Sequence, residues 1–346
     1  MRRRLAAVGA ACITTAAAVA AVATAATPTG PKAANGRKVQ LVATGVNTPT
    51  SFAFGAGKVF EGDAGNFQTN APGGVFLLKN GVPVRLAGSP DIVFGLVWHK
   101  NTLYIASGPK LLAWSGWNGI GFAKRQTIYT APKGFPGFNG LAFGPDGRLY
   151  AGVDVGETND HGPATAPYQY DILSFKPIGK GLKVFARGMR QPWQLAFPAG
   201  SSSPLVSDLG QDAGAQNPPD FVLKVHQGDN YGFPQCNWTD ASKCHGFKRP
   251  FKFFPSHSDV GGVAIIGKRL YLSEFGMGGK PAQVVAMPTA GGPVKQFVTG
   301  FSAPVVGLGA TGHWLYFGTV AMPNQPGKVF RVLAPGSSSS GPGFTG

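Results

Sequence analysis

The sequence predicts an all-β protein, a six-bladed β-propeller built of four-stranded blades. Three observations predict this fold: a turn-rich composition, a phrase that recurs six times, and short aromatic strands that follow it. The 346 residues include 52 Gly and 29 Pro, and only 13% are charged. No helical periodicity runs longer than about 12 residues, the usual length of a helix. The composition therefore favours strands joined by turns.

The recurring phrase is a β-rich run, a Gly/Pro/Asp turn and a short apolar strand. Its aligned apolar residues are Phe52, Leu96, Leu141, Leu195, Val263 and Val306. They lie roughly 43 to 68 residues apart, and a period near 40–50 residues in an all-β chain is typical of a propeller. Each phrase predicts the outer strand of one blade, a crossing turn and the inner strand of the next. The runs "NTLYIAS", "GRLYAGV", "KRLYLSE" and "HWLYFGT" predict the strands that follow.

The last blade needs a strand from the N-terminal end of the chain. After Val306 only "HWLYFGT" and "KVFRVLA" are clear candidates for further strands. The run "KVQLVA" precedes the first inner strand and has no neighbour of its own. We expect it to complete the last blade, which would close the ring and remove an exposed sheet edge.

The propeller is predicted to span residues 37–334. Residues 1–26 resemble a secretory signal, because arginines 2–4 precede an Ala-rich stretch and a small-residue cleavage site at Ala23–Ala25. An uncleaved membrane anchor and a lipid anchor at Cys12 are the alternatives. Residues 27–36 are predicted to be a linker and 335–346 a flexible tail. We therefore expect a secreted, periplasmic or cell-surface protein with no stable membrane insertion after cleavage.

Two spacings of the phrase are long and predict insertions at about 154–171 and 208–258. Long loops on a rigid scaffold are where binding sites usually lie. Both insertions flank "GMRQPWQLAF", in which Arg190 and Gln191 stand directly before an inner strand. We expect these two side chains at the mouth of the central channel. Asp154 and Glu157, in the first insertion, are expected to be solvated or to bind a cation.

Cysteine content and charge add two expectations. Cys236 and Cys244 are predicted to form a disulfide that closes a surface loop, as such pairs do in an oxidising compartment. The formal net charge of +16 favours association with polyanions. The Lys and Arg residues are scattered without interleaved aromatics, so no nucleic acid is expected as a partner.

Five segments follow one another along the chain: "ARGMRQPWQLAF", "DLGQD", "GDNYGFP", "HSDVGGV" and "FGMGGKPAQVVAM". In this order and approximate spacing, the chain resembles the glucose/sorbosone dehydrogenase family over residues 40–334. Its members are soluble sugar dehydrogenases that use pyrroloquinoline quinone (PQQ). The resemblance implies oxidation of an aldose-type sugar by hydride transfer to PQQ, with a diffusible electron acceptor.

The resemblance also implies cofactor contacts. Arg190 would contact the quinone, with Gln191 in place of the family's Asn and Lys280 as a further cofactor-binding residue. A guanidinium fork suits a planar, polyanionic ligand. The alternative is an arginine held by a loop carboxylate such as Asp208 or Asp212.

By the same resemblance Asp220, Asn217 and Asp212 could hold Ca²⁺, which prefers oxygen ligands. The family's Glu-Ile-Asn tripeptide in that loop reads Phe221-Val222-Leu223 here, and only Asp220 remains. Tyr231, Asp259 and His161 are candidate ligand-binding residues.

The general base of the family departs from its pattern here. The family places a histidine ahead of the "LAFGPDG" strand, but Pro136 or Phe138 occupies that place and neither accepts a proton. Three histidines could substitute: His257, with Asp259 two residues on, is the first candidate, and His161 and His226 are the others. The alternative function is a catalytically inactive family member that binds a cell-surface glycan or another polyanion.

Overall fold

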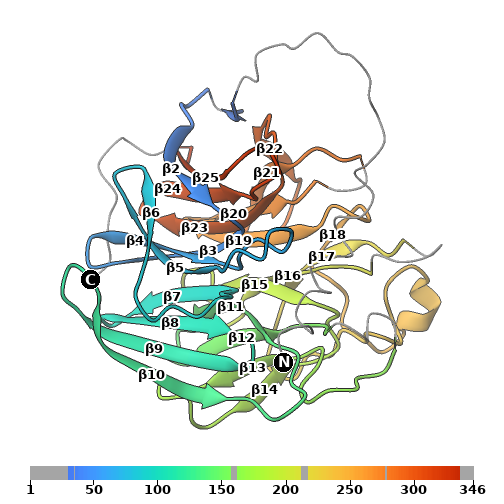
Figure 1. Cartoon of the computed structure of the whole chain (residues 1–346). Coiled ribbons are helices and arrows are strands. Elements are labelled where there is room, and N and C mark those ends of the chain that lie inside the picture. The colour runs from blue at the N-terminus through green and yellow to red at the C-terminus, as the bar shows by residue number, and fades with distance from the viewer. Residues whose placement is uncertain (1–29, 35, 157–161, 212–216, 277–278, 336–346) are drawn as a thin grey trace.

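The computed structural model describes residues 30–34, 36–156, 162–211, 217–276 and 279–335. It confirms the predicted six-bladed propeller: six antiparallel sheets are arranged so that their inner strands contact one another in a closed ring (Figure 1). The one helix among the described residues is a short 3-10 turn, η1 (Ala241–Cys244). No helix in these ranges is long and apolar enough to cross a membrane.

The blades follow one another along the chain, and each begins with its inner strand. Blade 1 consists of β3 (Pro49–Gly55), β4 (Lys58–Asp63), β5 (Gly74–Lys79) and β6 (Val82–Arg85). Blade 2 consists of β7 (Gly95–His99), β8 (Thr102–Ser107), β9 (Lys110–Trp117) and β10 (Phe122–Thr130). Blade 3 consists of β11 (Phe138–Phe143), β12 (Leu149–Val153), β13 (Ile172–Phe175) and β14 (Lys183–Ala186). Blade 4 consists of β15 (Pro192–Ala196), β16 (Leu205–Asp208), β17 (Asp220–Lys224) and β18 (Lys252–Phe254). Blade 5 consists of β19 (Val260–Ile266), β20 (Arg269–Glu274), β21 (Gln283–Pro288) and β22 (Lys295–Thr299). Blade 6 consists of β23 (Val305–Thr311), β24 (Trp314–Thr319), β25 (Gly327–Leu333) and β2 (Gln40–Val46).

The N-terminal strand closes the ring, as the sequence predicts. β2 pairs antiparallel with β25, with Gln40 opposite Arg331, and completes blade 6. A second N-terminal pairing had no sequence signal: the short β1 (Lys32–Ala33), within the predicted linker, adds a fifth strand to blade 5 beside β22. The N-terminal part of the chain thus contacts two blades.

The core lies between blades, because the side chains of each strand alternate between the two neighbouring sheets. Between blades 1 and 2, for example, Phe60 stacks on Trp98 with 5.6 Å between ring centroids and packs edge-on against Trp117. Burial of one such side chain stabilises the fold by about 1.5–3 kcal/mol.

Strand register corrects one sequence alignment. In blades 2 and 5 the aligned residues, Leu96 and Val263, pair with Ile105 and Leu272 and lie three residues before the inner strand ends. In blade 6 the residue at this position is Leu308. Val306, the residue aligned from the sequence, lies two positions too early. Blade 5 has the same ladder irregularity, between Val260 and Val263, so the two blades share one register. Val306 and Leu308 are both apolar, and the apolar pattern alone does not distinguish them.

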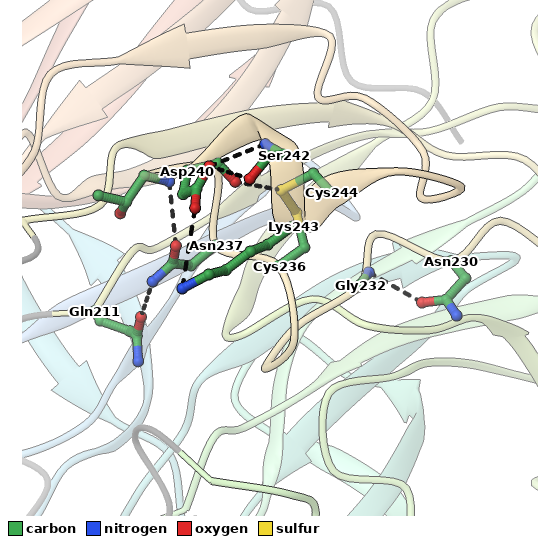
Figure 2. Close-up of a disulfide and its surroundings, with 10 residues drawn as sticks. Gln211, Asn230, Gly232, Cys236, Asn237, Asp240, Ser242, Lys243 and Cys244 are labelled. Carbon is green, nitrogen blue, oxygen red and sulfur yellow. Dashed lines mark hydrogen bonds and ion pairs between the residues drawn. A yellow bond between two sulfur atoms is a disulfide. The ribbon is translucent and has the colours of Figure 1, made fainter.

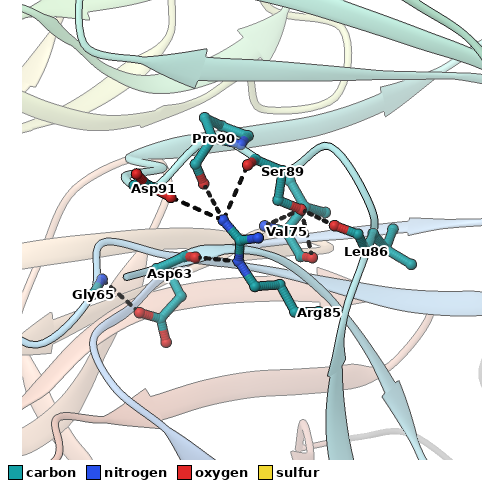
Figure 3. Close-up of polar contacts among 9 residues, drawn as sticks. Asp63, Gly65, Val75, Arg85, Leu86, Ser89, Pro90 and Asp91 are labelled. Carbon is teal, nitrogen blue, oxygen red and sulfur yellow. Dashed lines mark hydrogen bonds and ion pairs between the residues drawn. The ribbon is translucent and has the colours of Figure 1, made fainter. Parts of the chain in front are cut away.

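Blade 1 shows how the crossing loops are held (Figure 3). Arg85 Nε donates to the carbonyl of Gly73 at 2.8 Å, and Nη2 donates to the carbonyl of Ser89 at 3.0 Å and to Asp91 Oδ1 at 3.1 Å. At the same end of the blade, Asp63 accepts backbone N–H groups. These contacts fix the chain where it passes to the next inner strand.

Candidate functional site

The candidate site lies at the end of the channel where the six inner strands begin. Each second strand returns to this end, and three of them finish on a carboxylate: Asp63, Asp208 and Glu274. Asp154 directly follows β12. Four of the chain's 15 Asp and Glu residues therefore gather at one mouth, although the chain as a whole is strongly basic.

Arg190 lies at this mouth, directly before β15. Its side chain is buried, and Nη1 donates to the carbonyl of Leu209 at 3.3 Å and to that of Gly210. Burial raises the pKa of both Asp154 and Asp208, and the charge of Arg190 acts in the opposite direction. These contacts tie the start of the inner strand to the loop after β16.

Asp208 and Gln191 are joined through the backbone. Asp208 Oδ1 accepts the Gln191 N–H at 2.7 Å. Burial raises the pKa of Asp208 to about 7, although the Gln191 N–H and the Arg190 charge act in the opposite direction. Near neutral pH this carboxyl is therefore divided between its neutral and ionised forms.

Asp154 overturns the expectation of a solvated acid, because its side chain is 7% exposed. Its Oδ1 accepts the Gly156 N–H at 2.8 Å, and its Oδ2 accepts Gln191 Nε2 at 3.2 Å. The backbone explains the burial, since the Asp154 N–H donates to the Gly137 carbonyl and so folds the loop back onto β11. Burial raises the pKa of Asp154. Glu157 lies outside the described residues.

Asn139 extends the network and was not predicted from the sequence. It is fully buried, Nδ2 donates to the Pro192 carbonyl at 3.1 Å, and its hydrogen bond lowers the pKa of Asp154. The available signal was a polar residue inside an otherwise apolar inner-strand phrase, "GFNGLAF". Asn139, Asp154, Gln191 and Asp208 thus form one network of amide and carboxyl groups between blades 3 and 4.

Two of the three proposed metal ligands, Asp220 and Asn217, lie in the described structure. Asp220 is buried, and its two oxygens accept the N–H groups of Gly210 and Asp259 at 2.6 and 2.7 Å. Asn217 is exposed, and its Oδ1 lies 2.8 Å from His257 Nε2. Asp212 lies outside the described residues. Within the described ranges no group of three or more His, Cys, Asp and Glu could hold a metal ion.

His257 and Asp259 occupy the turn before β19, both with left-handed backbone. Asp259 is buried, whereas His257 is partly exposed and bonded to Asn217. Lys280 Nζ donates to the Ser256 carbonyl in the same turn. His161 lies outside the described residues.

Tyr231 lies within the second insertion. It is 3% exposed and its hydroxyl donates to the Lys224 carbonyl at 3.0 Å. Burial raises its pKa. With Arg190 and Asp208 it lines a cavity of about 20 Å³, room for about one water molecule.

The predicted disulfide between Cys236 and Cys244 is confirmed, and it closes a loop of the second insertion (Figure 2). Asn237 Nδ2 donates to Gln211 Oε1 at 2.7 Å, which joins this loop to the segment after β16. The insertion is thereby fixed beside the mouth.

Among the described residues, the side chains that the resemblance assigns to PQQ and Ca²⁺ are hydrogen-bonded to the backbone. Arg190 and Lys280 both donate to backbone carbonyls, and the oxygens of Asp220 accept backbone N–H groups. We therefore derive no reaction step through either group.

Comparison with known proteins shows the fold. No protein-family model and no curated protein matches the chain. The PQQ-bound aldose sugar dehydrogenase of Streptomyces coelicolor is 19% identical, with a TM-score of 0.67 over 88% of this chain and 98% of that one. A glucose dehydrogenase structure is 15% identical, with a TM-score of 0.69 over 87% and 99%. A gluconolactonase of Xanthomonas campestris is 13% identical, with a TM-score of 0.57 over 92% and 99%. The chain thus has the propeller fold found in PQQ-dependent sugar dehydrogenases and gluconolactonases.

Proposed function

We propose that this chain is an exported sugar-binding propeller. Its ligand is a small aldose-type sugar, or the terminal sugar of a cell-surface glycan, held at the mouth where β11 and β15 begin. The observation that carries the proposal is the network of Asn139, Asp154, Gln191 and Asp208. Amides both donate and accept hydrogen bonds, as does a carboxyl that is partly protonated, and sugar hydroxyls require both.

The structural neighbours support sugar as the ligand class more strongly than they support any one reaction. By their titles they include an aldose sugar dehydrogenase, a glucose dehydrogenase and a gluconolactonase. Oxidation and lactone chemistry differ, but a sugar is common to all three names.

Charge at the mouth favours a neutral ligand over a polyanion. Arg190 donates to backbone carbonyls and lies beside Asp154 and Asp208. The buried carboxyls of these two residues, where ionised, offset the attraction of Arg190 for an anionic polymer. The basic residues elsewhere on the chain remain the better match for a polyanion.

Export is supported by the leader-like N-terminal sequence and by the Cys236–Cys244 disulfide. Disulfides of this kind persist in oxidising compartments. We place the protein outside the cytoplasm, as a secreted, periplasmic or cell-surface protein.

The test is calorimetric titration of the mature protein with a panel of aldoses, without PQQ. We expect saturable binding of at least one sugar, and a loss of about tenfold in affinity for Gln191→Ala. The matched control is Gln296→Ala, which removes an exposed glutamine on β22, remote from the inner strands. Absence of binding by every sugar would overturn the proposal.

A second candidate function is oxidation of the bound aldose with PQQ and a diffusible acceptor. The observation that favours it is the PQQ-bound neighbour of similar fold. The test adds PQQ and Ca²⁺ to the protein and follows sugar-dependent dye reduction. Dye reduction that depends on sugar, PQQ and protein together supports a dehydrogenase, and its absence with sugar binding retained leaves the binding function alone.

A further inference from the structure

The inner strand of blade 4 carries a large side chain where four other blades have glycine. The register equates Gln194 with Gly95, Gly140, Gly262 and Gly307, and with Ser51 in blade 1. At the glycines a side-chain carbon would come within 2.5–2.8 Å of backbone atoms of the next inner strand. Neighbouring inner strands therefore approach one another closely at this level, and the channel is narrow here.

Gln194 spans the channel at that level. Its side chain is buried, Nε2 donates to the Thr50 carbonyl of blade 1, and Oε1 accepts the Val263 N–H of blade 5 at 3.0 Å. Blade 1 lies across the ring from blade 4, so the amide bridges the centre. The channel is blocked by this residue.

Trp193 lies next to this block and also reaches across the channel. Its ring packs edge-on against Phe94 of blade 2, with 5.6 Å between centroids. On the blade 5 side, a side-chain carbon at Gly261 would lie 3.7 Å from Trp193 Cδ1. Both aromatic rings remain partly exposed.

The exposed parts of these rings face the candidate site. The opposite half of the channel is a cavity of about 420 Å³, lined by Gln194 and by the residues that follow it in the inner strands. Neither Trp193 nor Phe94 lines that cavity. Both precede the narrow level in their strands, on the side where Arg190 and Gln191 lie. They therefore form the floor of the mouth.

We propose that Trp193 and Phe94 are the aromatic floor of a blind well, on which the ring of the bound sugar stacks. This inference rests on the proposed function and assigns the residues that recognise the sugar's apolar face. The C–H groups on a pyranose face are apolar and weakly positive, and an aromatic face is apolar and negative. Gln191 and Asp208 then meet the hydroxyls at the rim.

A blind well also restricts what enters. Because Gln194 closes the channel behind the floor, a ligand approaches from one side only and contacts the floor with its end. The site therefore takes a monosaccharide or a chain terminus and excludes the interior of a polymer. β-Cyclodextrin, a ring of glucose units without a free end, is the probe for this restriction.

The test compares sugar affinity in the wild type, Trp193→Ala and Trp193→Phe. We expect Trp193→Ala to lose about tenfold or more in affinity and Trp193→Phe to retain binding within a few fold. The matched control is Trp117→Ala, another partly exposed tryptophan, on β9 away from the inner strands. β-Cyclodextrin should not compete with the bound sugar.

Intrinsic fluorescence gives a second readout that does not need the alanine variant to fold. Sugar should change the tryptophan fluorescence of the wild type and of Trp117→Phe, but not that of Trp193→Phe. If the wild type binds sugar, and both Trp193 variants bind it with the same affinity and the same change in fluorescence, the proposed aromatic floor is wrong and the proposed function stands. If the wild type binds no sugar, the proposed function fails and the floor with it.

Discussion

Blades 1 and 4 stand opposite each other in the ring and begin in the same way. A proline opens each inner strand and pairs with an aspartate that ends the second strand, Pro49 with Asp63 and Pro192 with Asp208. Asp63 accepts the N–H groups of Asn47 and Thr48, and Asp208 accepts that of Gln191. The aspartate at this mouth is therefore part of the architecture and not in itself a sign of function.

The two blades differ in the side chains that they place on this shared backbone. Arg190 and Gln191 take the places of Asn47 and Thr48, and Gln194 takes that of Ser51. In the second strand it is blade 1 that carries the polar side chain: the buried Glu61 has the position that Val206 has in blade 4. The candidate site is thus a local substitution on a repeated frame, and each difference can be tested by exchange.

The largest expected effect is a pH dependence from Asp208. Because its folded pKa is raised from 3.8 to about 7, the folded state binds more protons than the unfolded state, and stability falls as pH rises from about 4 to beyond 7. The difference amounts to roughly 4 kcal/mol. Asp208→Asn keeps an oxygen for the Gln191 N–H and should lose this dependence. Urea unfolding of both proteins from pH 4 to 8 checks it, and parallel pH profiles would contradict it.

The second largest effect is a loss of stability on substitution of Asp63, the aspartate of blade 1, and it tests whether this residue has a structural role. Asp63 accepts backbone N–H groups from Asn47 and Gly65 at 2.7 and 2.6 Å, and from Thr48 at 3.2 Å. Asp63→Ala leaves these donors unpaired and should cost about 3 kcal/mol in free energy of unfolding. Asp63→Asn, which retains an acceptor, should cost less. Equal stability of Asp63→Ala and the wild type would contradict a structural role.

A stabilising exchange is expected at Glu61. This side chain is fully buried, and neither carboxyl oxygen has a hydrogen-bond partner among the described residues. Burial and the neighbouring Asp63 raise its pKa well above the usual range, so its cost to stability grows as pH rises above about 4. Glu61→Val copies blade 4 and should stabilise the protein by about 2 kcal/mol at pH 7 and by less at pH 4. Thermal unfolding at the two pH values distinguishes this outcome from a pH-independent packing gain.

The smallest expected effect comes from Gln194→Gly, which copies four of the other blades. It removes the side-chain hydrogen bonds to blades 1 and 5 and should cost about 1–2 kcal/mol in free energy of unfolding. Ser51→Ala, at the equivalent place in blade 1, serves as the control and should cost less. An unchanged midpoint in urea for Gln194→Gly would show that the bridge contributes nothing to stability.

The fold could be predicted because a propeller repeats its signal. Six phrases, aromatic second strands and an unpaired "KVQLVA" run are each visible in the sequence, and the pairing of β2 with β25 follows from them. The short β1 could not be predicted, because two residues carry no periodicity.

The sequence predicts where the candidate site lies, but not which of its side chains are buried or which groups they contact. Arg190 was placed at the mouth, yet its contacts depend on carbonyls of Leu209 and Gly210, 19 and 20 residues further on. Asp154 looked solvated because a loop that folds back onto a strand has no local signature. Gln194 did have a signal, since four phrases have glycine at its place.

The join between β2 and β25 has a consequence for the order of folding. Arg331 Nε donates to Gln40 Oε1 across 291 residues of chain, so the ring is an open arc until the last strand has been synthesised. Such distant contacts slow folding, and we expect blade 6 to form last. A chain ended before Gly327 would leave β2 without its neighbour, and it should expose a sheet edge and associate, as measured by light scattering. Blade 6 is therefore completed only when β2 and β25, strands from the two ends of the propeller, pair with each other.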